Sequence, residues 1–185
     1  MKVTTTKLSG VLVIEPQVFG DQRGYFIESF SAKRYEEAGI EESFVQDNMS
    51  YSQQGTLRGL HYQLHEPQGK LVHVLEGEVL DVVLDVRQGS ATFGQWESFK
   101  LSGDNHKQLY VPPGFAHGFS VLSASAYFCY KCTKYYNAQD EQGVLWDDPA
   151  LAIDWQLQGE PLLSAKDQAL LPLAQMPSHL LPKQA

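Results

Sequence analysis

The sequence predicts an all-β fold, an antiparallel sandwich or barrel, from three observations. Short segments rich in β-branched and aromatic residues recur along the 185 residues, turn residues separate them at close spacing, and helical periodicity is scarce. Closely spaced strands punctuated in this way are typical of all-β domains. The length suits a single domain, residues 1–185, with enough chain to bury a core.

The clearest expected strands are bounded by glycine, proline or polar clusters. They cover residues 11–14, 24–30, 71–75, 79–86, 107–111 and 127–135. In residues 79–86 the two-residue period places Leu80, Val82 and Leu84 on one face and Asp81 and Asp85 on the other. Acidic residues on such a face are usually solvated, but in a barrel with a polar lumen they could face a site.

Two short helices are expected at the margins of the strands. The first follows Ser31 as N-cap and ends near Gly39. The second starts at Ser164, with Asp167 three residues later in the position of a capping partner. The last stretch, residues 172–185, is expected to be loosely ordered.

Composition and charge narrow the classes of function. The net charge of −8 argues against a nucleic-acid-binding surface but leaves room for a small anionic ligand held by a few Arg and Lys residues. No apolar run approaches the ~18 residues that span a bilayer. The N-terminus lacks the apolar core of a secretory signal, so we expect no membrane association and a cytoplasmic protein.

The only cysteines, Cys129 and Cys132, have C-x-x-C spacing, which occurs in zinc and redox sites. They lie in an expected strand, where positions three apart point to opposite faces. The sequence therefore favours two structural cysteines and no disulfide framework.

Reactive side chains gather in three stretches. Residues 58–63 read RGLHYQ and are followed by His65, Lys70 and His73; residues 111–119 read VPPGFAHGF; and Tyr130 lies in the aromatic strand. The P-x-G-x-x-H pattern of the second stretch resembles the cupin superfamily of small β-barrels. Metal-binding cupins carry His-x-His in the partner motif, but Gln63 stands at the second histidine position here. His65 or His73 could still act as ligands, without the usual spacing, so a metal-dependent cupin enzyme stays an alternative.

The same stretches carry a more specific resemblance. Together with GYFIE at 24–28, QDN at 46–48, WDDP at 146–149 and SAKD at 164–167, they resemble the dTDP-4-dehydrorhamnose 3,5-epimerase family, in order, from residue 1 to about 175. This resemblance implies a cupin-like jelly-roll barrel with a few short peripheral helices. It also implies a homodimer, a dTDP-sugar substrate, and no metal or organic cofactor.

The resemblance implies four catalytic residues, and their chemistry suits proton exchange next to a ketone. His61 is a natural base, because an unperturbed histidine titrates near ~6.5. Asp167 would orient the His61 ring, Lys70 would lie by the C4 oxygen, and Tyr130 would deliver a proton from the opposite face. Each has a structural alternative: a core histidine, a helix-capping aspartate, a solvated turn lysine and a core tyrosine.

The resemblance also implies residues that contact the nucleotide or sugar. They are Arg23, Glu28, Gln46, Asn48, Arg58, His117, Glu141 and Lys166, with Phe19 and Phe26 as candidates for stacking on thymine. Arg23 and Glu28 could instead form surface ion pairs of little energetic value, and the two phenylalanines could be core residues. Among the remaining groups, His73 and Asp81 are candidates for supporting roles, while His65, His106 and His179 are expected to be exposed.

The predicted function is inversion of C3 and C5 of dTDP-4-dehydro-6-deoxy-D-glucose, which gives dTDP-4-dehydro-L-rhamnose. A relative that inverts only C3, or acts on another deoxysugar of an antibiotic pathway, would use the same visible residues. A sugar-binding barrel without catalysis is the third alternative, although binding alone needs no base, carboxylate, lysine and phenol together.

Overall fold

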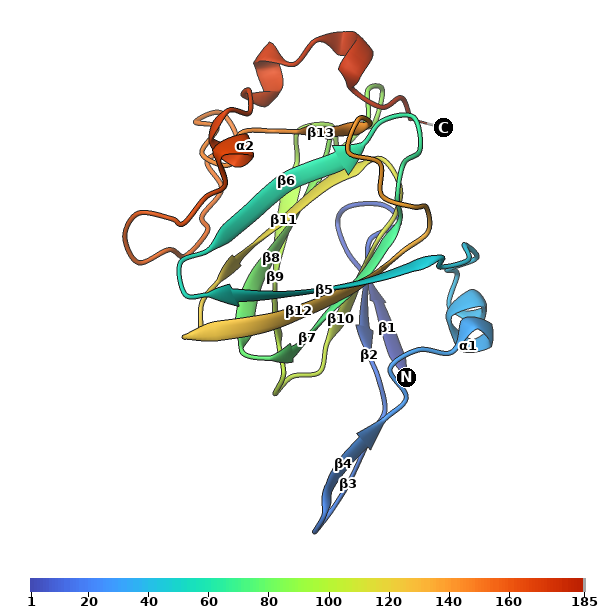
Figure 1. Ribbon diagram of the computed structural model, residues 1–185. Helices are drawn as coiled ribbons and strands as arrows, with labels where there is room; N and C mark the ends of the chain where they lie inside the picture. The colour runs from blue at the N-terminus through green and yellow to red at the C-terminus, as the bar shows by residue number, and fades with distance from the viewer. Residues whose placement is uncertain (185) are drawn as a thin grey trace.

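Two antiparallel sheets face each other in the computed structural model, which describes residues 1–184 (Figure 1). One sheet has the strand order β1-β2-β10-β7-β12-β5 and the other β13-β6-β11-β8-β9. The strands of the first sheet are β1 (Lys2–Thr5), β2 (Leu12–Glu15), β10 (Gln108–Val111), β7 (Lys70–Glu76), β12 (Ser125–Cys132) and β5 (Gln46–Gln53). Those of the second are β13 (Glu141–Gly143), β6 (Leu57–Gln63), β11 (Phe115–Val121), β8 (Glu78–Asp85) and β9 (Trp96–Ser102). The predicted all-β antiparallel fold is confirmed.

Each expected strand exists, with ends that differ by a few residues. The structure adds seven further strands, β1, β3, β5, β6, β9, β11 and β13, of which β5, β6 and β11 had stood out only as motifs. The inward positions of these last three carry polar groups such as Asn48, His61 and His117, so hydrophobic alternation does not reveal them as strands.

The interior of the barrel corrects the expectation for the acidic face of β8. Val79 and Val83, on that face, pack in the core between the sheets, and Asp81 and Asp85 are both 0% exposed. The opposite face, with Leu80 and its neighbours, lies outside the barrel and is covered by residues 144–181. The acidic residues point inward because the chain returns to cover the other face.

That return also corrects the expectation for the C-terminal stretch. Residues 172–184 are packed: they include two 3₁₀ turns, Leu173–Gln175 and Ser178–Leu180, and bury Leu173 and Leu181 against the outer face of the second sheet. The Leu173 amide donates to Asp148 at 2.8 Å. The last residue, 185, lies outside the described residues. Only a few apolar side chains, Leu173 and Leu181 among them, bury surface in this stretch, and they were not recognised from the sequence.

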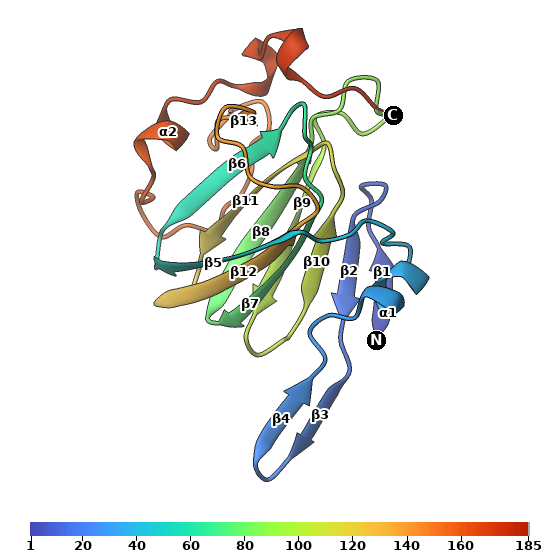
Figure 2. The ribbon, with the colours of Figure 1, turned by 45° about the vertical axis from the view of Figure 1, so that its right-hand side comes forward.

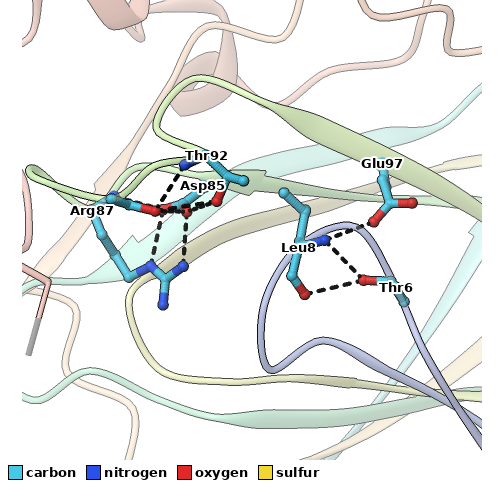
Figure 3. A network of polar contacts seen from close by, with 7 residues as sticks. Thr6, Leu8, Asp85, Arg87, Thr92 and Glu97 are labelled. Atoms are coloured by element: carbon cyan, nitrogen blue, oxygen red, sulfur yellow. Dashed lines mark hydrogen bonds and ion pairs between the residues drawn. The ribbon is translucent and has the colours of Figure 1, made fainter.

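Asp85 is buried with its charge fully compensated. Its carboxylate accepts hydrogen bonds from Arg87 Nη2 at 2.8 Å and from the hydroxyls of Ser90 and Thr92, both at 2.6 Å (Figure 3). The Arg87 guanidinium also lies 4.0 Å over the Phe115 ring. Because both oxygens of Asp85 accept hydrogen bonds, the energetic cost of burying its charge is offset. Asp85 therefore stabilises the loop that follows β8.

Both expected helices are present. α1 (Ala32–Glu37) follows Ser31, whose side chain makes no capping bond, and buries Tyr35 against the first sheet. α2 (Ala165–Gln168) is capped by the Ser164 hydroxyl, which accepts from the Asp167 amide. Within residues 1–184, no helix has the length and apolar character of a membrane span.

A separate hairpin of β3 (Val18–Asp21) and β4 (Gly24–Ile27) projects away from the barrel (Figure 2). Its aromatic residues are largely solvent-exposed: Phe19 is 60% exposed and Phe26 67%. A two-stranded ribbon is only marginally stable by itself, and exposed aromatic side chains are typical of a contact surface.

Candidate active site

One end of the barrel interior opens into a cavity of about 380 Å³ between the two sheets. Most of the predicted site residues line it. They are Gln46, Asn48, Arg58, His61, Lys70, His117, Tyr130, Glu141, Lys166 and Asp167. The elements that supply them are β6, β11, β13 and α2 on one side and β5, β7 and β12 on the other, and in Figure 1 β6, β13 and α2 lie above β5, β12 and β7.

His61 and Asp167 form a close pair on the wall made by β6 and α2. The His61 Nε2 atom lies 2.6 Å from Asp167 Oδ1. The Asp167 amide donates to the N-cap Ser164 hydroxyl at 3.1 Å, and its carboxylate contacts His61. Burial raises the pKa of Asp167, but the hydrogen bond and charge of His61 and the Ser164 hydroxyl outweigh it, so the pKa lies below its usual value.

Glu141 lies on the other side of the His61 ring. Its Oε1 is 3.5 Å from His61 Nδ1, while its Oε2 accepts from Tyr136 Oη at 2.8 Å and from the Lys166 ammonium. Burial raises the pKa of Glu141, and the Lys166 and Tyr136 hydrogen bonds more than offset this, so the carboxyl is ionised near neutral pH. The ring therefore stands between two carboxylates.

Lys70 and Tyr130 come from the opposite sheet. Lys70 begins β7 and pairs in register with Cys132, and Tyr130 lies two residues before Cys132 on the same face of β12. Burial lowers the pKa of Lys70 and raises that of Tyr130. The cavity thus has a histidine paired with carboxylates on one wall and an ammonium and a phenol on the other.

Two glycines let the strands that carry the histidines approach each other. Gly59 on β6 has φ +117°, and a Cβ there would lie 2.5 Å from the Gly118 Cα. A Cβ on Gly118 would lie 2.6 Å from the Arg58 carbonyl oxygen. This close contact explains the glycines beside both motifs, and it brings His61 and His117 opposite each other in register.

Four predicted contact residues do not line the cavity of their own chain. Phe19, Phe26 and Arg23 lie on the projecting hairpin, and Arg23 pairs with Asp21 at 2.6 Å. Glu28 pairs with Arg34 of α1 at 3.0 Å. The phenylalanines are not core residues either, because they are exposed.

Among the cavity residues that were not predicted as site residues are Cys132, interpreted from the sequence as structural, and Tyr136. Cys132 lies there with its sulfur 3.6 Å from Asn48 Nδ2, and Tyr136 lies beside Glu141. Cys132 lies two residues after Tyr130 in the same strand, so the two-residue period could have placed it on the cavity face. Tyr136 lies in a loop, where no periodicity predicts the direction of a side chain. Both cysteines are free and, as expected, Cys129 lies on the other face of the strand.

The remaining histidines lie outside the cavity. His73 shares the outer face of β7 with Leu71 and does not line the cavity. His106 is half-buried against the Tyr25 ring at 4.6 Å, whereas His65 and His179 are exposed as expected. In the part of the chain that the structure describes, no three His, Cys, Asp or Glu side chains are placed to hold a metal ion.

An antiparallel barrel whose cavity sets a paired histidine against a lysine and a phenol defines a class, the cupin-like sugar epimerases. The family model of dTDP-4-dehydrorhamnose 3,5-epimerase matches residues 5–175, and the chain belongs to this family. It is therefore an isomerase, an epimerase of a dTDP-sugar in rhamnose biosynthesis.

Individual relatives agree over nearly the full chain. A dTDP-4-dehydrorhamnose 3,5-epimerase of Pseudomonas aeruginosa is 53% identical over 169 residues, 91% of this chain and 93% of its own. The crystal structure of the 3,5-epimerase RmlC from Legionella pneumophila, in complex with dTDP-4-keto-L-rhamnose, matches with a TM-score of 0.97 and 54% identity, covering 100% and 98% of the two chains. A dTDP-4-dehydrorhamnose 3-epimerase of Streptomyces niveus is 39% identical over 95% of this chain and 85% of its own. The cupin-like fold is confirmed.

Proposed function

We propose that this chain inverts C3 and C5 of dTDP-4-dehydro-6-deoxy-D-glucose to give dTDP-4-dehydro-L-rhamnose, with His61 as the base. The observation that carries the assignment of roles is the cavity with His61 of β6 and Asp167 of α2 on one wall and Lys70 and Tyr130 of the first sheet on the other. The 3,5-epimerase activity itself follows from the family and from relatives at about 50% identity.

The reaction requires the proton on a carbon next to the C4 ketone to leave from one face and a new proton to arrive from the other. His61 takes the proton, and the Asp167 carboxylate stabilises the imidazolium that forms. Negative charge develops on the C4 oxygen as the enolate forms, and the Lys70 ammonium stabilises it. Tyr130 then protonates the carbon from the opposite face, which inverts it.

Two opposed walls suit this stereochemistry. A base and an acid on one strand would return the proton to the face that it left, without inversion. His61 on β6 and Tyr130 on β12 belong to different sheets, so a sugar between them has one group on each face. Arg58 and Lys166 are cations at the cavity and suit the pyrophosphate of a nucleotide sugar.

We test the number of inverted carbons by deuterium wash-in. The wild-type protein, with chelator present, is expected to incorporate solvent deuterium at both C3 and C5 of the product, measured by NMR and mass spectrometry. Label at C3 alone would favour the 3-epimerase reaction named for the Streptomyces niveus relative. Activity that is lost with chelator and restored by a divalent metal would favour the metal-dependent alternative.

We also propose a homodimer in which each hairpin completes the partner's site. Phe19, Arg23 and Phe26 lie far from the cavity of their own chain, yet the resemblance assigns them to the nucleotide. The outer face of the first sheet exposes further apolar side chains, including Met49 and Leu75, as a dimer interface would.

Mixing two inactive variants tests this arrangement. Arg23→Ala and His61→Asn each remove one element of the site, so each homodimer is expected to be nearly inactive. If the hairpin acts in the partner, random heterodimers contain one intact site, and the mixture recovers about a quarter of wild-type activity. No recovery, with heterodimers verified by two affinity tags, would show that Arg23 does not act across an interface.

The compartment follows from the substrate. A nucleotide sugar carries several charges and does not cross a bilayer unaided, so we place the reaction in the cytoplasm, where nucleotides are made.

A further inference from the structure

Asp81 is a buried carboxylate that the proposed mechanism leaves without a role. It lies on β8, faces the barrel interior with Val79 and Val83, and is 0% exposed. Its cross-strand neighbours are Phe119 on β11 and Phe99 on β9. A carboxylate among such groups is costly unless cations and hydrogen bonds compensate it.

The compensation of Asp81 is incomplete. Its Oδ2 lies 2.8 Å from His117 Nε2, but among residues 1–184 its Oδ1 has no hydrogen-bond partner although it is buried. Asp85, four residues later on the same strand, has both oxygens satisfied by Arg87, Ser90 and Thr92. The two aspartates share strand and burial, and only Asp81 keeps an unpartnered oxygen.

Lys70 is the complementary case. Its side chain comes from the first sheet and lines the cavity, as does His117, while Asp81 comes from the second sheet and lies 2.8 Å from His117 Nε2. No hydrogen bond or ion pair joins the Lys70 ammonium to another side chain in the described part of the protein. A half-buried cation and a buried carboxylate, each incompletely satisfied, are therefore linked through His117, which lines the cavity with Lys70 and is bonded to Asp81.

We propose that Asp81 is the counter-ion of Lys70, a positioning residue that keeps the lysine charged for the developing C4 oxyanion. The inference rests on the proposed function, because supporting the charge of Lys70 matters for catalysis only if Lys70 acts on the ketone oxygen. His117 completes the cluster by fixing the Asp81 carboxylate through Nε2.

The charges around the pair agree with this arrangement. Burial lowers the pKa of Lys70, and Cys132 on β12, Glu141 on β13 and Asp81 on β8 act against that change. Burial raises the pKa of the Cys132 thiol, which leaves it uncharged near neutral pH, and Glu141 is already paired with Lys166. Burial likewise raises the pKa of Asp81, and His117 and Lys70 oppose it. Of these three acidic groups, Asp81 is the one with a buried oxygen that has no partner among residues 1–184, so this oxygen is available to the Lys70 ammonium.

Asp81→Asn tests the proposal, because it removes the charge and keeps the shape. We would follow the Lys70 titration in ligand-free protein by NMR of ¹³C-labelled lysine, and the pH dependence of kcat. The variant should titrate Lys70 at a lower pH than the wild type. The alkaline limb of kcat should move with it by about one pH unit, a tenfold loss of rate on that limb, while KM changes less than about threefold.

Asp85→Asn is the matched control, since it removes a buried charge from the same strand whose partners are Arg87, Ser90 and Thr92 and not His117. It should lower the thermal midpoint and leave both titrations in place. An unchanged Lys70 titration in Asp81→Asn would overturn the proposal even if the rate fell. So would an equal shift in Asp85→Asn.

A second variant keeps the test decisive if Asp81→Asn does not fold. Coupling between two charges is reciprocal, so Lys70→Met should raise the pH at which the ¹³C-labelled Asp81 carboxyl titrates. An unchanged Asp81 titration in Lys70→Met would contradict the proposed pairing of Asp81 with Lys70. Failure of the proposed function is a different result: wild-type protein would place no deuterium on C3 or C5, whereas the NMR titrations need no substrate.

Discussion

His61→Asn is expected to lose deuterium wash-in at both C3 and C5, with kcat reduced about 10³-fold. Asparagine can still hydrogen-bond to Asp167 but cannot take a proton at neutral pH. The His61 side chain lies at the cavity surface and not in the packed core, so the thermal midpoint should change little. The measurement is single-turnover incorporation of label, read by NMR at each carbon.

Two comparisons make the His61 result specific. Tyr130→Phe keeps the base but lacks the opposing acid. This variant should still exchange the substrate proton with solvent, but it should invert the carbon slowly. His65→Asn changes an exposed histidine just beyond β6 and should match the wild type. Wild-type exchange in His61→Asn would rule out His61 as the base.

Lys70→Met is expected to have the second largest effect, a fall in kcat of about 10²–10³-fold, which corresponds to ~2.7–4 kcal/mol of transition-state stabilisation. Methionine fills similar space without the charge, and the enolate oxygen would then face a buried, apolar side chain. The loss should appear mainly in kcat, because the charge on C4 develops only as the proton leaves.

Steady-state kinetics with a circular dichroism melt would separate this catalytic loss from unfolding. Lys134→Met, an exposed lysine two residues beyond β12, is the control for removal of a positive charge. A Lys70→Met rate within threefold of the wild type would mean that another group stabilises the C4 oxygen.

The sequence by itself determined the fold class, the strands with clear hydrophobic alternation, and both helix starts. It also supplied the motifs around His61 and His117, because the glycines beside them are required where β6 and β11 come within contact distance. The family resemblance named the groups that line the cavity, and its order along the chain made it specific.

Only the tertiary structure decided which face of a strand points inward. The alternation in β8 separates Asp81 from Leu80, but the period is the same whichever face is buried, and the C-terminal residues settle the matter by covering Leu80. The same packing ordered the stretch that composition alone suggested was loose.

The location of each site residue relative to the others was likewise a matter of tertiary structure. Sequence spacing cannot show that His61 and Tyr130 stand on opposed sheets, or that Arg23 and Phe26 project away from the cavity of their own chain. Strand pairing between distant segments fixes these relations, and that pairing depends on long-range packing rather than on local propensity.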